Sequence, residues 1–433
     1  MEADSQHTTG TSPEMSRVVQ HFFRRETGKM VATLTGIFGL EHLSLAEDVV
    51  QEALVRALQT WPFYGVPKNP AAWIMRTSRN LAVDVVRRQK VFRDKEAEII
   101  RLMDRGASSP DAVIFSDAEI TDDTLRMMFV CCHPSLPPEI QVALALKALC
   151  GFSVTEIARA FLTTDAAIAK RLTRARQKIQ EARIPFELPA SEAVAQRLDG
   201  VLQSLYLLFN EGYKASGGDK LVREEVCEEA IRLTALLVEH PAGNRPKTHA
   251  LLALMLLDTA RIPARVDHEG NLLRLQEQDR ARWSQPIIAR GMFHLAQSAV
   301  GGEIGVYHLQ AGIAACHCST PDYASTDWRQ ILSLYDRLVQ LDGSPVIALN
   351  RAIVIANLRG PRAGLDALAA VPDLEALNTY YLLHAVLGEF ESQLNNAKAA
   401  ASHFRKSLEL AEIKTEQVFL AKRLQACEEQ SRV

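Results

Sequence analysis

The sequence predicts an all-α protein built from several domains in series. Apolar residues recur at helical spacing along most of the chain, and the alternating β-branched runs that indicate strands are nearly absent. At 433 residues the chain is too long for one ordinary domain. Its 47% hydrophobic and 23% charged residues are typical of globular proteins with apolar cores.

The composition favours a reducing compartment and gives no sign of a membrane segment. No apolar run approaches the ~20 residues that span a bilayer. Residues 1–14 are polar and lack the apolar block of a secretion signal. The seven cysteines have no disulfide-framework spacing. We therefore expect a cytoplasmic protein.

Two clusters of cysteine and histidine raise the question of a metal site. They are Cys131–His133 and Cys316–Cys318. Neighbouring residues cannot easily all turn toward one tetrahedral ion, and neither cluster has the spaced pairs of a structural zinc site. We interpret these residues as packing positions, and we expect neither a metal nor another cofactor.

The net charge of −3 conceals two basic segments. Residues 76–95 contain seven basic and two acidic side chains, and residues 170–183 contain six basic and one acidic. Two separated basic helices in an acidic protein suggest two contacts with a polyanion. A solvated helix face is an equally good explanation of either segment taken alone.

The first predicted domain covers residues 15–92. Ser44 and Glu47 have the spacing of a capping box and should begin a helix. A Pro-, Gly- and aromatic-rich loop is expected over 62–69, and Asn69–Pro70 should begin the next helix. The buried stripe predicted for the first of these helices consists of Val50, Ala53, Leu54, Ala57, Leu58 and Trp61. Ile74, Leu81 and Val85 should face inward from the second, and Trp73 is also assigned to the core.

Residues 93–123 are predicted to form a flexible, charged linker, broken at 106–110. About 25 such residues, fully extended, span roughly 80 Å. The domains on either side could therefore act at distant points on one ligand.

The second predicted domain, residues 124–184, has the pattern of a helix-turn-helix. A short helix over 154–161, a tight turn over 162–165 and a basic helix over 166–181 follow one another. The turn lacks the glycine often found there. Residues expected to pack the two helices together are Ile157, Ala158, Ile168 and Leu172.

From residue 185 the basic clusters fade and amphipathic helices continue to the end. We divide this part into a helical extension, residues 185–300, and tetratricopeptide (TPR)-like helical repeats, residues 301–433. Leu387–Gly388 is followed by Ala400, Phe404 and Ser407 at the offsets of a TPR unit. One unit earlier, Ala352, Gly364 and Leu368 occupy similar places. A helical solenoid is expected.

Three segments resemble the extracytoplasmic-function (ECF) RNA polymerase sigma factors. Residues 46–53, AEDVVQEA, resemble the helix that binds core polymerase. Residues 70–84 resemble the helix that melts and reads the −10 promoter element, and residues 157–176 resemble the helix-turn-helix that reads the −35 element. The segments lie in the family's order and spacing. The resemblance implies a sigma factor whose partners are core RNA polymerase and promoter DNA.

The resemblance also implies roles for individual residues. Asp48, Gln51 and Glu52 share one helix face and would contact polymerase, although an ordinary solvated acidic face has the same pattern. Phe63 and Tyr64 could stack on a flipped base, or they could merely close a small core. The remaining −10 candidates are Arg76, Asn80, Asp84, Arg87 and Arg88, with Asn80 suited to a base edge and the arginines to phosphates. The −35 candidates are Ala167, Lys170, Arg171, Arg174 and Lys178.

The chain departs from the usual ECF pattern in two places. Ala169 stands where a lysine is common, which leaves the −35 sequence open. The extension resembles that of a subgroup with a LLFNEGY motif, here residues 207–213, followed by TPR-like repeats. Residues 210–213 could form a docking surface for the sigma domains or simply end a helix with Gly212. Our hypothesis is an intramolecular regulator that contacts the sigma domains.

Two other classes of protein compete with this interpretation. A helix-turn-helix transcriptional regulator with a TPR-like sensor domain would bind DNA without polymerase. This interpretation leaves the acidic helix at residues 46–53 without a function. A TPR scaffold leaves both basic segments unexplained. An enzyme is not expected, because the sequence has no phosphate-binding glycine loop and no recognisable nucleophile, base and orienter set.

Overall fold

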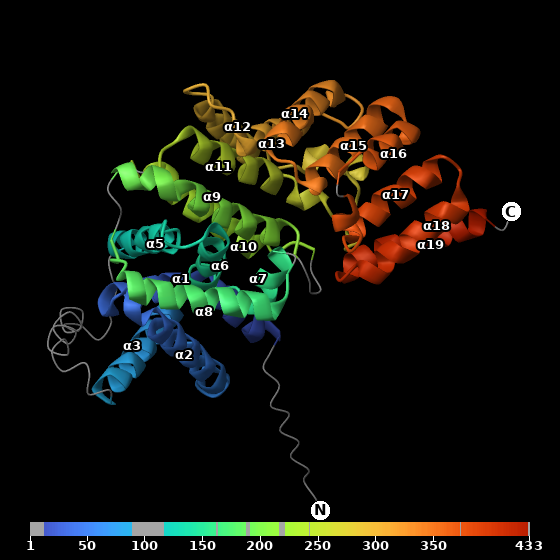
Figure 1. The fold of residues 1–433 in the computed structure, drawn as a ribbon. Helices are drawn as coiled ribbons and strands as arrows, with labels where there is room; N and C mark the ends of the chain where they lie inside the picture. Colours follow the sequence, from blue (N-terminus) through green and yellow to red (C-terminus); the bar gives the residue numbers. More distant parts are fainter. Residues whose placement is uncertain are drawn as a thin grey trace, which may run out of the picture. The chain divides into compact units, whose positions relative to one another are not determined.

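The fold is all-α, as predicted. The computed structural model describes residues 13–88, 117–161, 163–187, 191–215, 221–241, 243–372 and 374–431. Extended backbone pairs in an isolated antiparallel bridge between Val266 and Leu272. The chain forms two compact units, Met1–Leu208 (unit 1) and Phe209–Val433 (unit 2) (Figure 1).

Unit 1 contains the two domains predicted to lie on either side of the linker. Its helices are α1 (Pro13–Phe38), α2 (Leu43–Tyr64), α3 (Pro70–Arg88), α5 (Asp117–Cys131), α6 (Pro138–Ala148), α7 (Val154–Ala160), α8 (Asp165–Ala182) and the greater part of α9 (Ser191–Tyr213). The linker predicted over 93–123 ends earlier than expected, because α5 already begins at Asp117. Residues 93–116 lie outside the described residues. The unit ends within α9 and not at the predicted boundary after residue 184.

Helix α1 is the shared support of unit 1, because it packs against α2 and α3 and also against α5 and α6. Val31, Ala32 and Leu34 in its C-terminal half are almost completely buried. At Gly28 the helix backbone meets the end of α6 so closely that an added Cβ would lie 1.8 Å from the carbonyl oxygen of Leu149. Only a glycine permits this approach, which joins the two predicted domains in one core.

Helix α2 begins and packs differently from the prediction. It starts at Leu43, after His42, and no side chain caps it, so the predicted Ser44–Glu47 capping box is wrong. The Glu47 carboxylate instead accepts a hydrogen bond from Arg176, 129 residues later. The predicted stripe is otherwise buried, but Leu58 is 43% exposed because it lies at the edge of the inward face.

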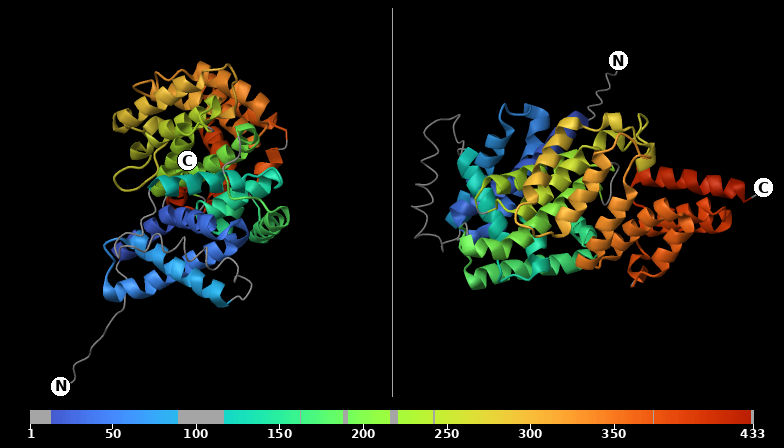
Figure 2. Two further views of the ribbon diagram at one scale, coloured as in Figure 1. Left: turned by 90° about the vertical axis from the view of Figure 1, so that its left-hand side faces the viewer. Right: turned by 90° about the horizontal axis from the view of Figure 1, so that it is seen from above.

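Unit 2 is a succession of helices in chain order (Figure 2). They are α10 (Glu224–Glu239), α11 (Pro246–Thr259), α12 (Gln285–Ser298), α13 (Val306–Cys318), α14 (Trp328–Leu341), α15 (Pro345–Arg359), α16 (Pro361–Ala369), α17 (Tyr381–Gln393), α18 (Ala397–Leu410) and α19 (Lys414–Gln430). Consecutive helices from α13 to α19 pack against each other, and the TPR-like positions Ala400, Phe404 and Ser407 are buried. An added Cβ at Gly388 would touch the Phe404 ring at 3.1 Å, so this position needs a very small residue.

The 207–213 motif has a role that neither sequence interpretation included. Gly212 lies inside the last turn of α9, where a Cβ would come within 2.6 Å of the Cys227 amide at the start of α10. Glu211 is buried and pairs with Arg223 at 2.9 Å. Tyr213 stacks on Phe209, with ring centroids 5.7 Å apart. These residues fasten α9 to the beginning of α10 within unit 2.

The two cysteine and histidine clusters are part of the helix packing. Cys131 and Cys132 are buried at the end of α5, and burial raises the pKa of the Cys132 thiol to about 12. His317 is buried at the end of α13. In the part of the chain that the structure describes, no group of three or more potential ligands is placed to hold a metal ion. None of the helices in those ranges is both long enough and apolar enough to cross a membrane.

Candidate nucleic-acid interface

The acidic face of α2 is exposed along its whole predicted length. Asp48, Gln51 and Glu52 all face solvent, on the side of the helix opposite the buried Val50 and Leu54. Glu52 accepts a hydrogen bond from Arg56 one turn later, at 3.0 Å, which leaves Asp48 as the less compensated charge. The face is therefore available to a cationic partner.

The last turn of α2 presents two aromatic side chains to solvent. The helix continues through Pro62, so Phe63 and Tyr64 belong to it and not to the loop predicted over 62–69. They are 73% and 88% exposed and do not close the core. Gly65, with φ of 79°, then turns the chain away from the helix.

Helix α3 begins as the sequence predicts. The Asn69 side chain accepts a hydrogen bond from the Ala72 amide at 3.0 Å, and Pro70 occupies the first helical position. Ile74 is fully buried. Trp73 is half-buried and meets Trp61 of α2 edge to face, with ring centroids 5.6 Å apart. This pair holds α3 against α2.

The outer side of α3 carries the −10 candidates. Arg76, Asn80 and Asp84 are exposed and follow one another every four residues, so they form a single stripe. Arg87 and Arg88 belong to the final turn of α3, but their side chains lie outside the described residues.

Side-chain hydrogen bonds cap the first turns of both helices of the helix-turn-helix, α7 and α8. Ser153 and Glu156 form a complete capping box at the start of α7. The Thr164 hydroxyl caps α8, and the Thr155 hydroxyl donates to Asp165 at 2.6 Å across the turn. These bonds fix the angle between the helices without the glycine that such turns often contain. The four residues predicted to pack the pair are buried: Ile157, Ala158, Ile168 and Leu172.

The exposed face of α8 contains most of the −35 candidates, and Arg171 lies apart from them. Lys170, Arg174 and Lys178 are exposed at four-residue spacing, and Ala167 near the start of the helix is half-buried. Arg171 is half-buried, with its guanidinium 5.5 Å from the centre of the Phe161 ring. Its position stabilises the helix-turn-helix by a cation–π contact.

Sequence reasoning missed the ion pair between α2 and α8. Glu47 and Arg176 approach to 2.6 Å, and their side chains are 10% and 35% exposed. Glu47 immediately precedes the acidic face, and Arg176 lies among the basic residues of α8. No pattern of local spacing connects residues so distant in the chain, so only the tertiary structure reveals the pair.

Comparisons with protein families agree with this division. The family Sigma-70 region 2 matches residues 23–91, and Sigma-70, region 4 matches residues 126–179. A family of unknown function, DUF6596, matches residues 197–299. The first match contains α2 and α3, and the second contains α7 and most of α8.

Individual relatives extend the comparison. An uncharacterized protein of Rhizobium meliloti, R00370, is 40% identical over 387 residues, which are 88% of this chain and 90% of that protein. A probable ECF RNA polymerase sigma factor of Mycobacterium tuberculosis, SigI, is 28% identical over 156 residues, which are 36% of this chain and 53% of that protein. No solved structure matches the chain.

The two sigma-70 regions, their order and the relationship to SigI lead to one assignment. The chain belongs to the ECF type of RNA polymerase sigma factors and carries a C-terminal extension that includes the DUF6596 region.

Proposed function

We propose that this sigma factor binds core RNA polymerase through Asp48, Gln51 and Glu52 of α2, and directs it to promoters through α3 and α8. The observation that carries the proposal is the exposure of these three polar faces in the two sigma-70 regions. Each face has the chemistry that its task needs. The α2 face offers carboxylates to a cationic protein surface, the α3 stripe offers Arg76 and Asn80 to DNA, and the α8 stripe is basic.

The −10 element would be bound as separated strands. Unstacking a base costs a few kcal/mol, and an aromatic platform returns about 1–3 kcal/mol per base. The exposure of Phe63 and Tyr64 supports their use as such a platform. Asn80 offers an amide for a base edge, while Arg76 suits a phosphate. We assign the same phosphate role to Arg87 and Arg88, and Asp84 completes the candidate stripe.

The −35 element would be bound as duplex DNA by the exposed face of α8. Lys170, Arg174 and Lys178 form its basic stripe, with Ala167 nearest the helix start. We propose that Arg171 positions this face through Phe161, and that it does not itself contact DNA. This reassigns one residue that the sequence alone groups with the DNA contacts.

A helix-turn-helix regulator with a TPR-like sensor domain is the alternative function. It would bind an operator without polymerase. The match of region 2 and the exposed acidic face of α2 support the sigma role over this alternative.

Charge reversal of the acidic face tests polymerase binding. The double variant Asp48→Lys/Glu52→Lys should lower affinity for core polymerase at least about 100-fold, because opposite charges across the interface become like charges. Affinity would be measured by titrating fluorescently labelled full-length chain with core enzyme.

A matched control is Glu224→Lys/Glu228→Lys on α10, where two exposed carboxylates have the same four-residue spacing. The control should bind core polymerase as the unaltered protein does, and both variants should keep its helical circular dichroism. Unchanged affinity in the α2 variant would remove the acidic face from the polymerase interface.

Removal of basic side chains from α8 tests the −35 assignment. The salt dependence of promoter binding by the holoenzyme is the slope of the logarithm of the binding constant against the logarithm of the salt concentration. This slope should become shallower by about one for each lost phosphate contact in the variants Lys170→Ala, Arg174→Ala and Lys178→Ala. Arg171→Ala should instead lower the melting temperature and leave this slope unchanged, because its cation lies over Phe161. Equal salt slopes in all four variants would contradict the assignment of this face.

We further propose that the extension controls the sigma regions by an intramolecular contact. Its removal should change promoter-dependent run-off transcription by about fivefold or more, the size of ordinary coupling between sites. The cut belongs after Leu208, because Val194, Leu198 and Leu202 of α9 are buried within unit 1. Equal output from the shortened and full-length chains, at equal core binding, would exclude control by the extension.

A further inference from the structure

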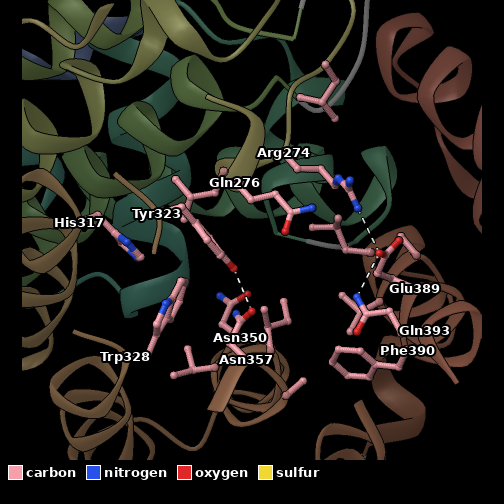
Figure 3. Close-up of a pocket in the computed structure, with 18 of the residues that line it drawn as sticks. Arg274, Gln276, His317, Tyr323, Trp328, Asn350, Asn357, Glu389, Phe390 and Gln393 are labelled. Atoms are coloured by element: carbon pink, nitrogen blue, oxygen red, sulfur yellow. Dashed lines mark hydrogen bonds and ion pairs between the residues drawn. The ribbon is translucent and has the colours of Figure 1, made fainter. Parts of the chain in front are cut away.

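Unit 2 contains a cavity that the sigma function does not use. It has a volume of about 440 Å³, within the usual range for small-molecule sites. Its walls come from α13, α14, α15 and α17 and include Tyr335 and Ile353. Figure 3 shows Trp328 and Phe390 among the lining side chains. Most of this lining is apolar and aromatic.

A loop crosses what would otherwise be an open concave surface. Leu272, Arg274 and Gln276 line the cavity from the 265–283 segment. Arg274 fastens this segment to α17 by an ion pair with Glu389 at 3.1 Å, and Asn271 accepts a hydrogen bond from Lys422 of α19. Stacked helical hairpins usually present a long groove to proteins. Here the loop reduces part of it to a pocket of small-molecule size.

The charges of the pocket are already compensated. Arg274 pairs with both Glu277 and Glu389, and Glu389 also accepts from Arg423 at 2.6 Å. Burial lowers the pKa of His317 to about 3, so this ring is neutral at pH 7. A charged ligand would lose its hydration without meeting an opposite charge that is free to pair with it.

The polar groups left in the pocket are neutral. Figure 3 shows Gln276, Tyr323, Asn350 and Asn357 turned toward the same space. Tyr323 donates to Asn357 at 2.9 Å, whereas the amides of Asn350 and Gln276 have no hydrogen-bond partner among the described residues. His317 is 8% exposed, lines the pocket, and has a ring nitrogen, Nδ1, without a partner in those ranges. These groups could both donate to and accept from a ligand.

We propose that this pocket binds an uncharged small molecule that combines a ring system with an amide, carbonyl or hydroxyl group. The aromatic walls accommodate the ring, and the free amides of Asn350 and Gln276 bind the polar group. The proposal concerns a ligand site of unit 2 and needs neither polymerase nor DNA, so it stands or fails separately from control of transcription by the extension.

Two probes of equal size test the ligand class on the full-length chain. Naphthalene-2-carboxamide should bind in isothermal titration, and naphthalene-2-carboxylate should bind at least tenfold more weakly, because its charge would be buried unpaired. Ala385→Phe, which fills the pocket from α17, should abolish carboxamide binding. The control variant Ala369→Phe adds the same atoms at an exposed position of α16. This control should bind the carboxamide with the affinity of the unaltered protein.

A second variant, Asn350→Leu, changes an exposed position at which folding is insensitive to the substitution. This variant should bind the carboxamide at least about fivefold more weakly, because the hydrogen bond to the ligand is lost. Absence of carboxamide binding, equal affinity for the two probes, or binding that survives both Ala385→Phe and Asn350→Leu would each overturn the proposal.

Discussion

The close contact between α1 and the end of α6 governs the arrangement of unit 1. Where Gly28 meets Leu149, two backbones touch with no side chain between them, so dispersion contacts form directly between the two main chains at this point. Helix α1, most of which lies within the sigma-70 region 2 match, thereby also packs against α5 and α6, which overlap the region 4 match. The two sigma-70 regions thus share one hydrophobic core. The Glu47–Arg176 ion pair adds a directional bond to this otherwise non-directional packing.

The sequence predicted best what depends on neighbouring residues. The Asn69–Pro70 helix start and the buried set Ile157, Ala158, Ile168 and Leu172 follow from local capping and from helical periodicity, and both were found. The capping box at Ser44 failed, because the helix already begins at Leu43 and Ser44 therefore lies inside it. Glu47 forms an ion pair at 2.6 Å with Arg176 of a distant helix, which local spacing could not predict.

The extension illustrates the same division between local and distant information. Small and aromatic residues such as Gly388 and Phe404 predicted helical hairpins, because a hairpin packs against its immediate neighbour. The pocket could not be predicted, since it requires Arg274 from a loop to meet Glu389 more than 100 residues later. The role of Gly212 was also hidden, because a glycine near a helix end suits both a cap and a close helix contact, and only the position of Cys227 distinguishes them.

The two aromatic side chains at the end of α2 have a consequence for how this protein could change over generations. Since Phe63 and Tyr64 lie outside the core, no packing requirement fixes their identity. Replacements there should be nearly neutral for folding, as surface substitutions usually are. Under the stacking role proposed for these residues, the preference for particular bases could therefore drift, or be selected in the laboratory, without compensating mutations in the interior.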